Sequence, residues 1–137
     1  MGGGQSKEHE HMGLMSAISG NAGEIPADQA QQDLHNLFVE GERVEKAYQV
    51  GRDVFAFTQF RLLLVNKQGI TGAKVEYRSI PYRSITNFSV ETAGSFDLDA
   101  ELKIWVNGNP EAISKEFNKK VNVYEVQSVL ARHVVAL

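Results

Sequence analysis

The sequence contains no cysteine, and this absence excludes several kinds of chemistry at once. Disulfides, thiolate metal sites and a cysteine nucleophile are all ruled out. The absence agrees with a reducing compartment. The N-terminal stretch MGGGQSKEHEHMGLM also lacks the basic start and long apolar core of a secretory signal. We therefore expect a cytoplasmic protein.

Long apolar runs are also missing, because none approaches the roughly 20 residues that a membrane-spanning helix needs. Positive charge is not in excess either: 14 Lys and Arg stand against 17 Asp and Glu, for a net charge of -3. This balance offers no overall attraction to a phosphate backbone, which disfavours nucleic acid as a partner and leaves only a local basic patch open. The length of 137 residues suits one domain with a single core.

What the sequence does contain is a central block of predicted strands. Residues 44–50 form the first, with Val44, Tyr48 and Val50 on one face. The next two, at 54–58 and 61–65, include the runs VFAF and LLLV, which are apolar on both faces. Antiparallel strands of this kind need cover on both sides, by the core on one and by a helix, another sheet or another subunit on the other. The last alternative is a first indication of oligomerisation.

Four more strands follow, and turn residues separate them: 74–79, 84–91, 98–106 and a strand that returns after the hairpin signal Asn107-Gly108. In the strand at 84–91, Ile85 and Phe88 differ in parity. A β-bulge near Asn87 is needed to turn both side chains inward.

Helices are predicted at both ends of the strand block. Residues 1–11 are Gly-rich and charged, and we expect them to be disordered. Residues 12–40 form a helical lead, and residues 41–137 form the domain itself. The lead, whose longer helix is expected at 26–39, either packs on the domain or serves as a partner or self-association element.

The C-terminal helix has the clearest start signal in the chain. Asn122 can cap it, and Glu125, three residues later, can complete a capping box. An apolar stripe then recurs at helical spacing and should close the core, formed by Val123, Val126, Leu130, Val134 and Leu137.

This element order resembles the pleckstrin-homology (PH) superfold. The segments KQGITG, VEYRSIPY and ETAGSFDLDAELKIW resemble the bacterial PH domain family, formerly a family of unknown function, and the likeness extends from about Glu40 to the C-terminus. It implies a mainly β fold: a seven-stranded antiparallel bent sandwich or barrel capped by a C-terminal α-helix, with short N-terminal helices. It also implies no assigned enzymatic role, no cofactor, and assembly into a cyclic homo-oligomer, with five copies as the expected ring.

Four residues are candidates for ligand binding because they fall near strand ends, where the PH superfold usually receives ligands: Arg52, Lys67, Lys74 and Asn107. Relatives that bind phosphoinositides gather several Lys and Arg around the first strand pair. Here the equivalent turn, Gly51-Arg52-Asp53, offers one base beside one acid. The alternative is that the four residues are solvated turn residues.

No motif indicates a catalytic, metal or cofactor site. His9 and His11 lie in the N-terminal tail, where a weak metal site is the alternative to a solvated segment. His35 and His133 lie on predicted helices. Carboxylates share one strand face and favour a solvated surface over an acid/base pair or a cation site: Asp97, Asp99 and Glu101. The glycines of KQGITG favour a turn, because no Gly-Lys-Ser/Thr follows them.

The first functional hypothesis is therefore a non-enzymatic oligomeric scaffold or protein-binding module, whose partner is itself or an unidentified protein. The alternative is a peripheral membrane domain that binds lipid headgroups. That alternative requires a cluster of basic side chains to appear in the folded protein.

Overall fold

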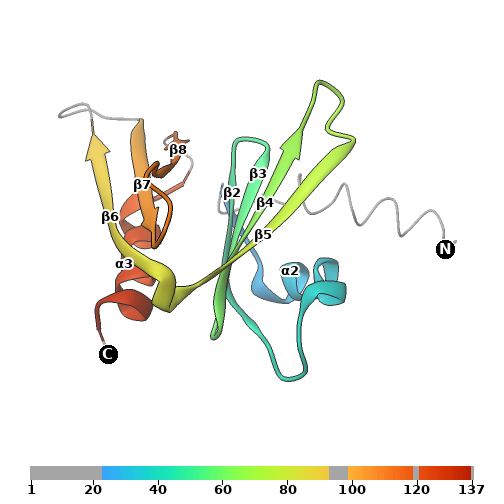
Figure 1. Cartoon of the computed structure of the whole chain (residues 1–137). Coiled ribbons are helices and arrows are strands. Elements are labelled where there is room, and N and C mark those ends of the chain that lie inside the picture. The colour runs from blue at the N-terminus through green and yellow to red at the C-terminus, as the bar shows by residue number, and fades with distance from the viewer. Residues whose placement is uncertain (1–22, 93–98, 119–120, 137) are drawn as a thin grey trace, which may run out of the picture.

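The computed structural model describes residues 23–92, 99–118 and 121–136, so the expected disordered tail and the first part of the helical lead lie outside the described residues. Two antiparallel sheets and a C-terminal helix make up the molecule (Figure 1). The first sheet contains, in spatial order, β1 (Glu24–Ile25), β2 (Val44–Val50), β3 (Asp53–Thr58), β4 (Arg61–Gln68) and β5 (Lys74–Pro81). The second contains β6 (Ile85–Thr92), β7 (Ala100–Val106) and β8 (Ile113–Phe117).

These elements confirm the expected mainly β, PH-like architecture with a helix at the C-terminus. The seven predicted strands are all present, and the two-residue β1 adds an eighth to the edge of the first sheet. The helices are α2 (Ala27–Asp33) and α3 (Val123–Val134), and 3-10 turns lie at His35–Leu37 and Tyr82–Ser84. The second of these turns connects the two sheets.

The main core lies between the two sheets and α3. A ring contact joins the sheets directly, because Phe55 on β3 meets Phe117 on β8 edge to face, with 5.6 Å between the centroids. Helix α3 closes the open side of this core with its predicted apolar stripe, of which Val123, Val126 and Leu130 are buried. Each such side chain contributes about 1.5–3 kcal/mol by leaving water.

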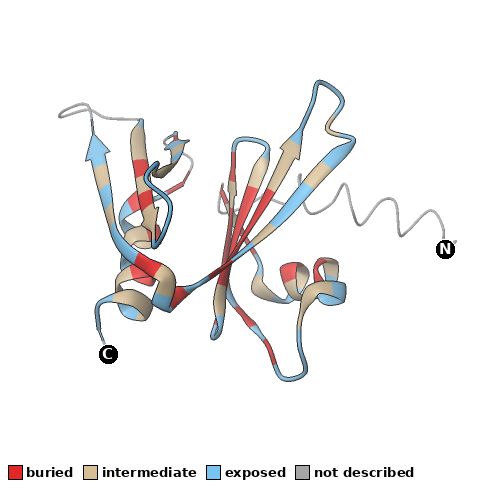
Figure 2. Ribbon diagram, in the orientation of Figure 1, coloured by how far each residue is buried: buried red, intermediate tan, exposed pale blue. Residues whose placement is uncertain are grey.

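A second core lies on the opposite face of the first sheet, under α2. Ala30 and Leu34 of the helical segment pack there against side chains from the strands: Val44, Ala47, Val54, Ala56, Leu63 and Val65. β3 and β4 are therefore buried on both faces, as Figure 2 shows along the centre of the sheet. The prediction that both faces need cover is confirmed, and a helix of the same chain supplies it. The apolar runs consequently give no separate evidence for a second subunit.

Two local predictions were wrong. Val44 does not share a face with Tyr48 and Val50, because the pairing of β2 with β3 shifts register between Val44 and Lys46, and this bulge turns Val44 towards α2. The helix expected at 26–39 is also shorter. It ends at Asp33, and Leu34, with φ -108° and ψ 15°, leads into a 3-10 turn instead of another α-helical turn.

Two other local predictions are confirmed. The pairing of β6 with β7 shifts register between Ile85 and Asn87, so that Ile85 is buried and Phe88 packs against the same core. At the N-terminus of α3, the Asn122 side chain accepts hydrogen bonds from the amides of Tyr124 and Glu125. Glu125 does not complete the predicted capping box. Its carboxylate instead accepts a hydrogen bond from the Tyr48 hydroxyl at 2.8 Å.

We predict that α2 unfolds together with the sheet. Leu34 is only 5% exposed, so L34A should lower the free energy of unfolding by about 2–5 kcal/mol through the cavity it leaves. Val39 follows the same helical segment but is 59% exposed, and V39A should change the stability by less than about 0.5 kcal/mol. Urea unfolding of both variants measures the difference. Equal effects would show that α2 is not part of the cooperative unit.

Candidate functional site

The turn end of the first sheet gathers three of the four predicted ligand-binding residues. Arg52 lies in the β2–β3 turn, while Lys67 and Lys74 flank the β4–β5 turn, and we call these three residues the basic tip. Arg52 donates a hydrogen bond from Nη2 to the carbonyl of Gly69 at 2.9 Å, which fastens one turn to the other. Gly72, at φ +72°, lies under both side chains: a Cβ there would be 2.9 Å from Arg52 Nη2 and 3.9 Å from Lys67 Cδ.

Asn107 lies elsewhere. Its backbone amide donates a hydrogen bond to the carbonyl of Ser84 at 2.7 Å. Ser84 ends the 3-10 turn that follows β5. Since Lys74 begins β5 and Pro81 ends it, Asn107 belongs to the opposite end of the molecule from the basic tip. The four predicted residues therefore do not form one site.

The acidic groups nearest to the basic tip form no ion pair with its side chains, although the Asp53 carboxylate accepts a hydrogen bond from the backbone amide of Lys67 at 3.0 Å. Asp53, which follows Arg52 in sequence, forms an ion pair with Lys115 of β8 at 2.8 Å. Glu76 accepts a hydrogen bond from the Asn66 side chain at 3.0 Å. Within the described part of the chain, no carboxylate pairs with Lys67 or Lys74. The tip is thus a local concentration of positive charge on an acidic protein.

The other end of the first sheet contains a buried ion pair that sequence reasoning missed. Glu42 is 3% exposed, and Arg61 binds it twice, through Nε and Nη2, both at 2.8 Å. The Thr58 hydroxyl donates to the same carboxylate at 2.7 Å. Arg61 also donates to the carbonyl of Leu37 at 2.6 Å, which ties the segment after α2 to the β3–β4 turn. Nothing in the sequence pairs Glu42 with Arg61, because 19 positions separate them.

Two opposing effects act on the pKa of Glu42. Burial alone would raise the pKa of this carboxyl group, but the hydrogen bonds from Arg61 and Thr58 and the positive charge of Arg61 outweigh it, so the pKa is below the usual 4.5. Glu42 is therefore ionised in the folded protein at neutral pH. It acts as a structural anchor for three chain segments, not as an acid or base.

The two described histidines have structural partners. His133 on α3 pairs with Glu45 at 2.8 Å and stacks on Tyr82, with 4.1 Å between ring centroids. His35 lies 2.9 Å from the Gln32 carbonyl through Nδ1. His9 and His11 lie outside the described residues. Among the residues that the structure describes, no three His, Asp or Glu side chains are placed to hold a metal ion.

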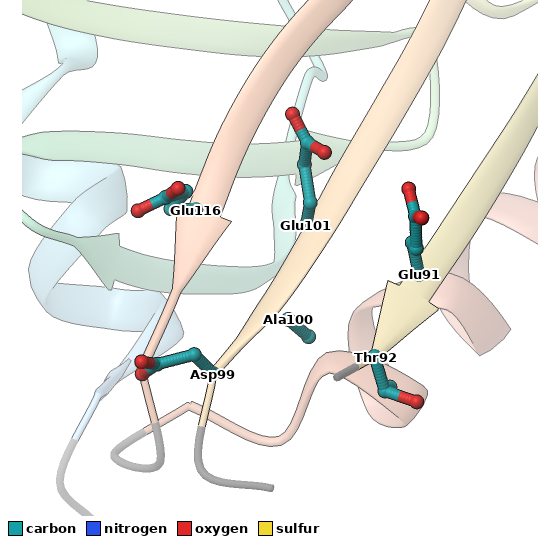
Figure 3. Close-up of a pocket in the computed structure, with 6 residues that line it drawn as sticks. All are labelled: Glu91, Thr92, Asp99, Ala100, Glu101 and Glu116. Atoms are coloured by element: carbon teal, nitrogen blue, oxygen red, sulfur yellow. The ribbon is translucent and has the colours of Figure 1, made fainter. Parts of the chain in front are cut away.

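Acidic side chains line a shallow hollow on the second sheet. It has a volume of about 260 Å³, and Figure 3 shows its lining residues: Glu91, Thr92, Asp99, Ala100, Glu101 and Glu116. Sequence reasoning placed Glu101 with Asp97 and Asp99 along one strand. The structure keeps Asp99 and Glu101 at one hollow and adds the cross-strand partners of Glu101, which are Glu91 on β6 and Glu116 on β8, while Asp97 lies outside the described residues. The register between the strands brings these three glutamates together, and spacing in the sequence does not reveal that register.

The family of the chain follows from its sequence as well as its fold. A family model described as bacterial PH domain matches residues 13–134. The chain belongs to the bacterial PH domain family. In the described part of the chain, no helix is both long and apolar enough to span a membrane.

Two curated relatives of this PH domain come from Bacillus subtilis (strain 168). The uncharacterized protein YjqA is 51% identical over 121 residues, which are 88% of this chain and 97% of the relative. The uncharacterized protein YozO is 34% identical over 101 residues, which are 74% of this chain and 86% of the relative.

Solved structures agree on the fold. A DUF1696 family protein with a PH domain from Shewanella loihica PV-4 is 45% identical, with a TM-score of 0.74 over 87% of this chain and 100% of its own. A PH domain from Shewanella amazonensis SB2B is 43% identical, with a TM-score of 0.75 over 80% and 99% of the two chains. The resemblance drawn from the sequence motifs is thereby confirmed.

The lowered pKa of Glu42 gives a testable pH dependence. Because the folded state binds this proton less tightly than the unfolded state, Glu42 stabilises the fold above about pH 4.5, and the contribution is lost as the pH falls through the folded-state pKa. E42Q leaves Arg61 without its counter-charge and should lower the free energy of unfolding at pH 7 by about 3 kcal/mol. Its stability should also fall less than that of the wild type on acidification.

Urea unfolding at pH 7, 5, 4 and 3 measures both effects. The control is E40Q, since Glu40 is an exposed glutamate two positions away. An E42Q curve parallel to that of the wild type across the acid range would contradict this role for Glu42.

Proposed function

We propose that this bacterial PH domain is a non-enzymatic, cytoplasmic module that assembles with copies of itself and offers the assembly as a scaffold to a protein partner. A cyclic arrangement, with five copies as the expected number, is the form that the family resemblance implies. Neither described histidine forms a hydrogen bond with a hydroxyl group, since His35 bonds to Gln32 and His133 to Glu45. The hydroxyl of Tyr82, on which His133 stacks, donates to the carbonyl of Thr58. This arrangement favours binding over catalysis.

The observation that carries the proposal is the open edge of the first sheet. β5 is eight residues long, ends the strand order, and pairs only with β4 among the described residues. Along it, Tyr77 is 46% exposed although it lies opposite the buried Val65. An edge strand of this length presents unpaired backbone groups to another chain, and natural proteins usually cover such an edge.

An edge that meets a different surface of the next copy produces a head-to-tail interface. Interfaces of that kind close into rings when the rotation between copies is favourable. β5 therefore fits a cyclic assembly better than it fits an isolated monomer. The cover on the far face of β3 and β4 comes from α2, so the open edge and not the buried strands supports the proposal.

Size-exclusion chromatography with light scattering tests the assembly. We expect a mass several times that of the 15.2 kDa chain, and five copies for the cyclic form. Dilution should lower the mass only below the dissociation constant of the assembly. A species of 15.2 kDa at all concentrations would refute the proposal.

A lipid-headgroup domain is the second candidate, and the basic tip favours it. The turn around Arg52 holds one base in the sequence, but the fold brings Lys67 beside it and Lys74 to the same end. Ile70, at the end of this hairpin, is 99% exposed. Phosphate oxygens accept charge-assisted hydrogen bonds from side chains arranged in this way.

Liposome sedimentation tests this second candidate. If the tip binds headgroups, anionic liposomes should sediment the wild type at low salt, and K67A/K74A should weaken that binding at least tenfold, while 0.5 M salt should abolish it. The control is R43A/R83A, which removes the same charge at two exposed residues away from the tip. Equal binding by both double variants, or no binding by the wild type at low salt, would remove the candidate.

A further inference from the structure

Three glutamates lie in one line across the outer face of the second sheet. Glu91 on β6 is the direct partner of Glu101 on β7, and Glu101 is the direct partner of Glu116 on β8. We call these residues the glutamate row, and Figure 3 shows their carboxyl groups on the three neighbouring strands. They face away from the core, since the next residues along the strands, Leu102 and Phe117, are buried in it.

Like charges placed directly opposite each other destabilise a sheet. Within the described residues, Lys103 alone approaches the row, with its Nζ 4.0 Å from Glu101, and the Ser114 hydroxyl donates to the same glutamate. Glu91 and Glu116 are exposed and have no ion pair there. The fold thus keeps a repulsive arrangement that its own described cations do not neutralise.

The basic tip is the complementary surface on the same molecule. It lies at the turns of the first sheet, whereas the glutamate row lies on the outer face of the second sheet, and Figure 1 shows the two sheets as separate units of the fold. Arg52, Lys67 and Lys74 match the row in number, three positive charges against three negative ones. The β4–β5 hairpin that carries Lys67 and Lys74 also projects beyond the neighbouring β2–β3 turn, as Figure 1 shows.

We propose that the basic tip of one copy docks on the glutamate row of the next copy. This inference rests on the proposed self-association and names the surfaces that perform it. The tip and the row are different surfaces on separate sheets. Each copy can therefore dock its tip on one neighbour and receive the tip of another neighbour on its row. The contact is therefore heterologous, and repetition around an axis closes it into a ring.

The second copy is favoured over other occupants by charge complementarity. A lipid surface or nucleic acid would bind the tip but would be repelled by the row, and would leave Glu91 and Glu116 without a counter-charge. A second copy neutralises both surfaces with one contact. The open edge of β5 runs back from Lys74, so the docked hairpin would bring this edge to the neighbouring subunit as well.

Charge reversal tests the contact. K67E/K74E reverses the tip, and E91K/E116K reverses the row while leaving Glu101 with its Ser114 hydrogen bond. We expect each double variant alone to lose the multimeric mass and to run at 15.2 kDa in light scattering. We expect the four substitutions combined in one chain to restore the wild-type mass. A mixture of the two double variants should form mixed complexes but not a closed ring of five, because the two variants must alternate around the ring.

The controls show whether the position of a charge reversal matters or only the change in net charge. R83E and E111K reverse exposed residues outside both surfaces and should leave the mass unchanged. Far-UV circular dichroism verifies the folding of every variant, and restoration in the combined chain cannot come from an unfolded protein. Raising the salt from 0.05 to 0.5 M should lower the wild-type mass.

The outcomes distinguish this inference from the function on which it rests. A monomeric wild type would overturn both. A multimeric wild type whose mass neither double variant changes would overturn the docking contact and leave self-association in place. A combined variant that stays monomeric would also overturn it, as would a K67E/K74E protein that keeps its mass but loses binding to anionic liposomes.

Discussion

Burial of β3 and β4 on both faces is the constraint on which the rest of the structure depends. Phe55 and Phe57 point into the core shared with the second sheet and α3, while Val54 and Ala56, between them in sequence, point towards α2. Strands of this kind cannot remain at a surface, because exposure would cost about 1.5–3 kcal/mol for each large apolar side chain. The helical segment before β2 and the sheet-and-helix unit after β5 are therefore both required, one for each face. The first sheet is therefore the middle of three layers, between α2 on one face and the second sheet with α3 on the other.

The charged groups follow from the same arrangement. Since the faces of the first sheet are covered, charges collect at its ends and on the outer side of the second sheet. At one end, the buried pair of Glu42 and Arg61 binds the segment after α2 to a turn of the sheet. At the other end, the basic tip has no such partner among the described residues. The two ends therefore differ: the charges at the first are paired within the chain, and the basic side chains at the second form no ion pair among the described residues. The proposed contact with the glutamate row would supply such a pair.

The parts of the fold that depend on neighbouring residues were predictable, and those that depend on distant contacts were not. The bulge at Asn87 follows from the parity of two apolar residues, and the cap at Asn122 from a side chain within reach of the next amides. Val44 looked equivalent to Tyr48 until its pairing with β3 shifted the register. Glu125 was expected to bond within its own helix, yet Tyr48, 77 positions away, is its partner. The same distinction applies to the candidate site. Spacing in the sequence indicated that its four residues lie near turns, but it did not show that Asn107 lies at the other end of the molecule from Arg52, Lys67 and Lys74.

By itself, the sequence determined the order of strands, the amphipathic C-terminal helix, the need for cover on two faces, and a resemblance to bacterial PH domains carried by long motifs. These properties are local, because alternation, turn chemistry and capping depend on residues a few positions apart. The tertiary structure decided which cover is used, which charges are paired within the chain and which form no ion pair among the described residues. The reason is that ion pairs and cross-strand partners depend on register and on sheet packing, which bring together residues such as Asp53 and Lys115, 62 positions apart. No local pattern contains that information.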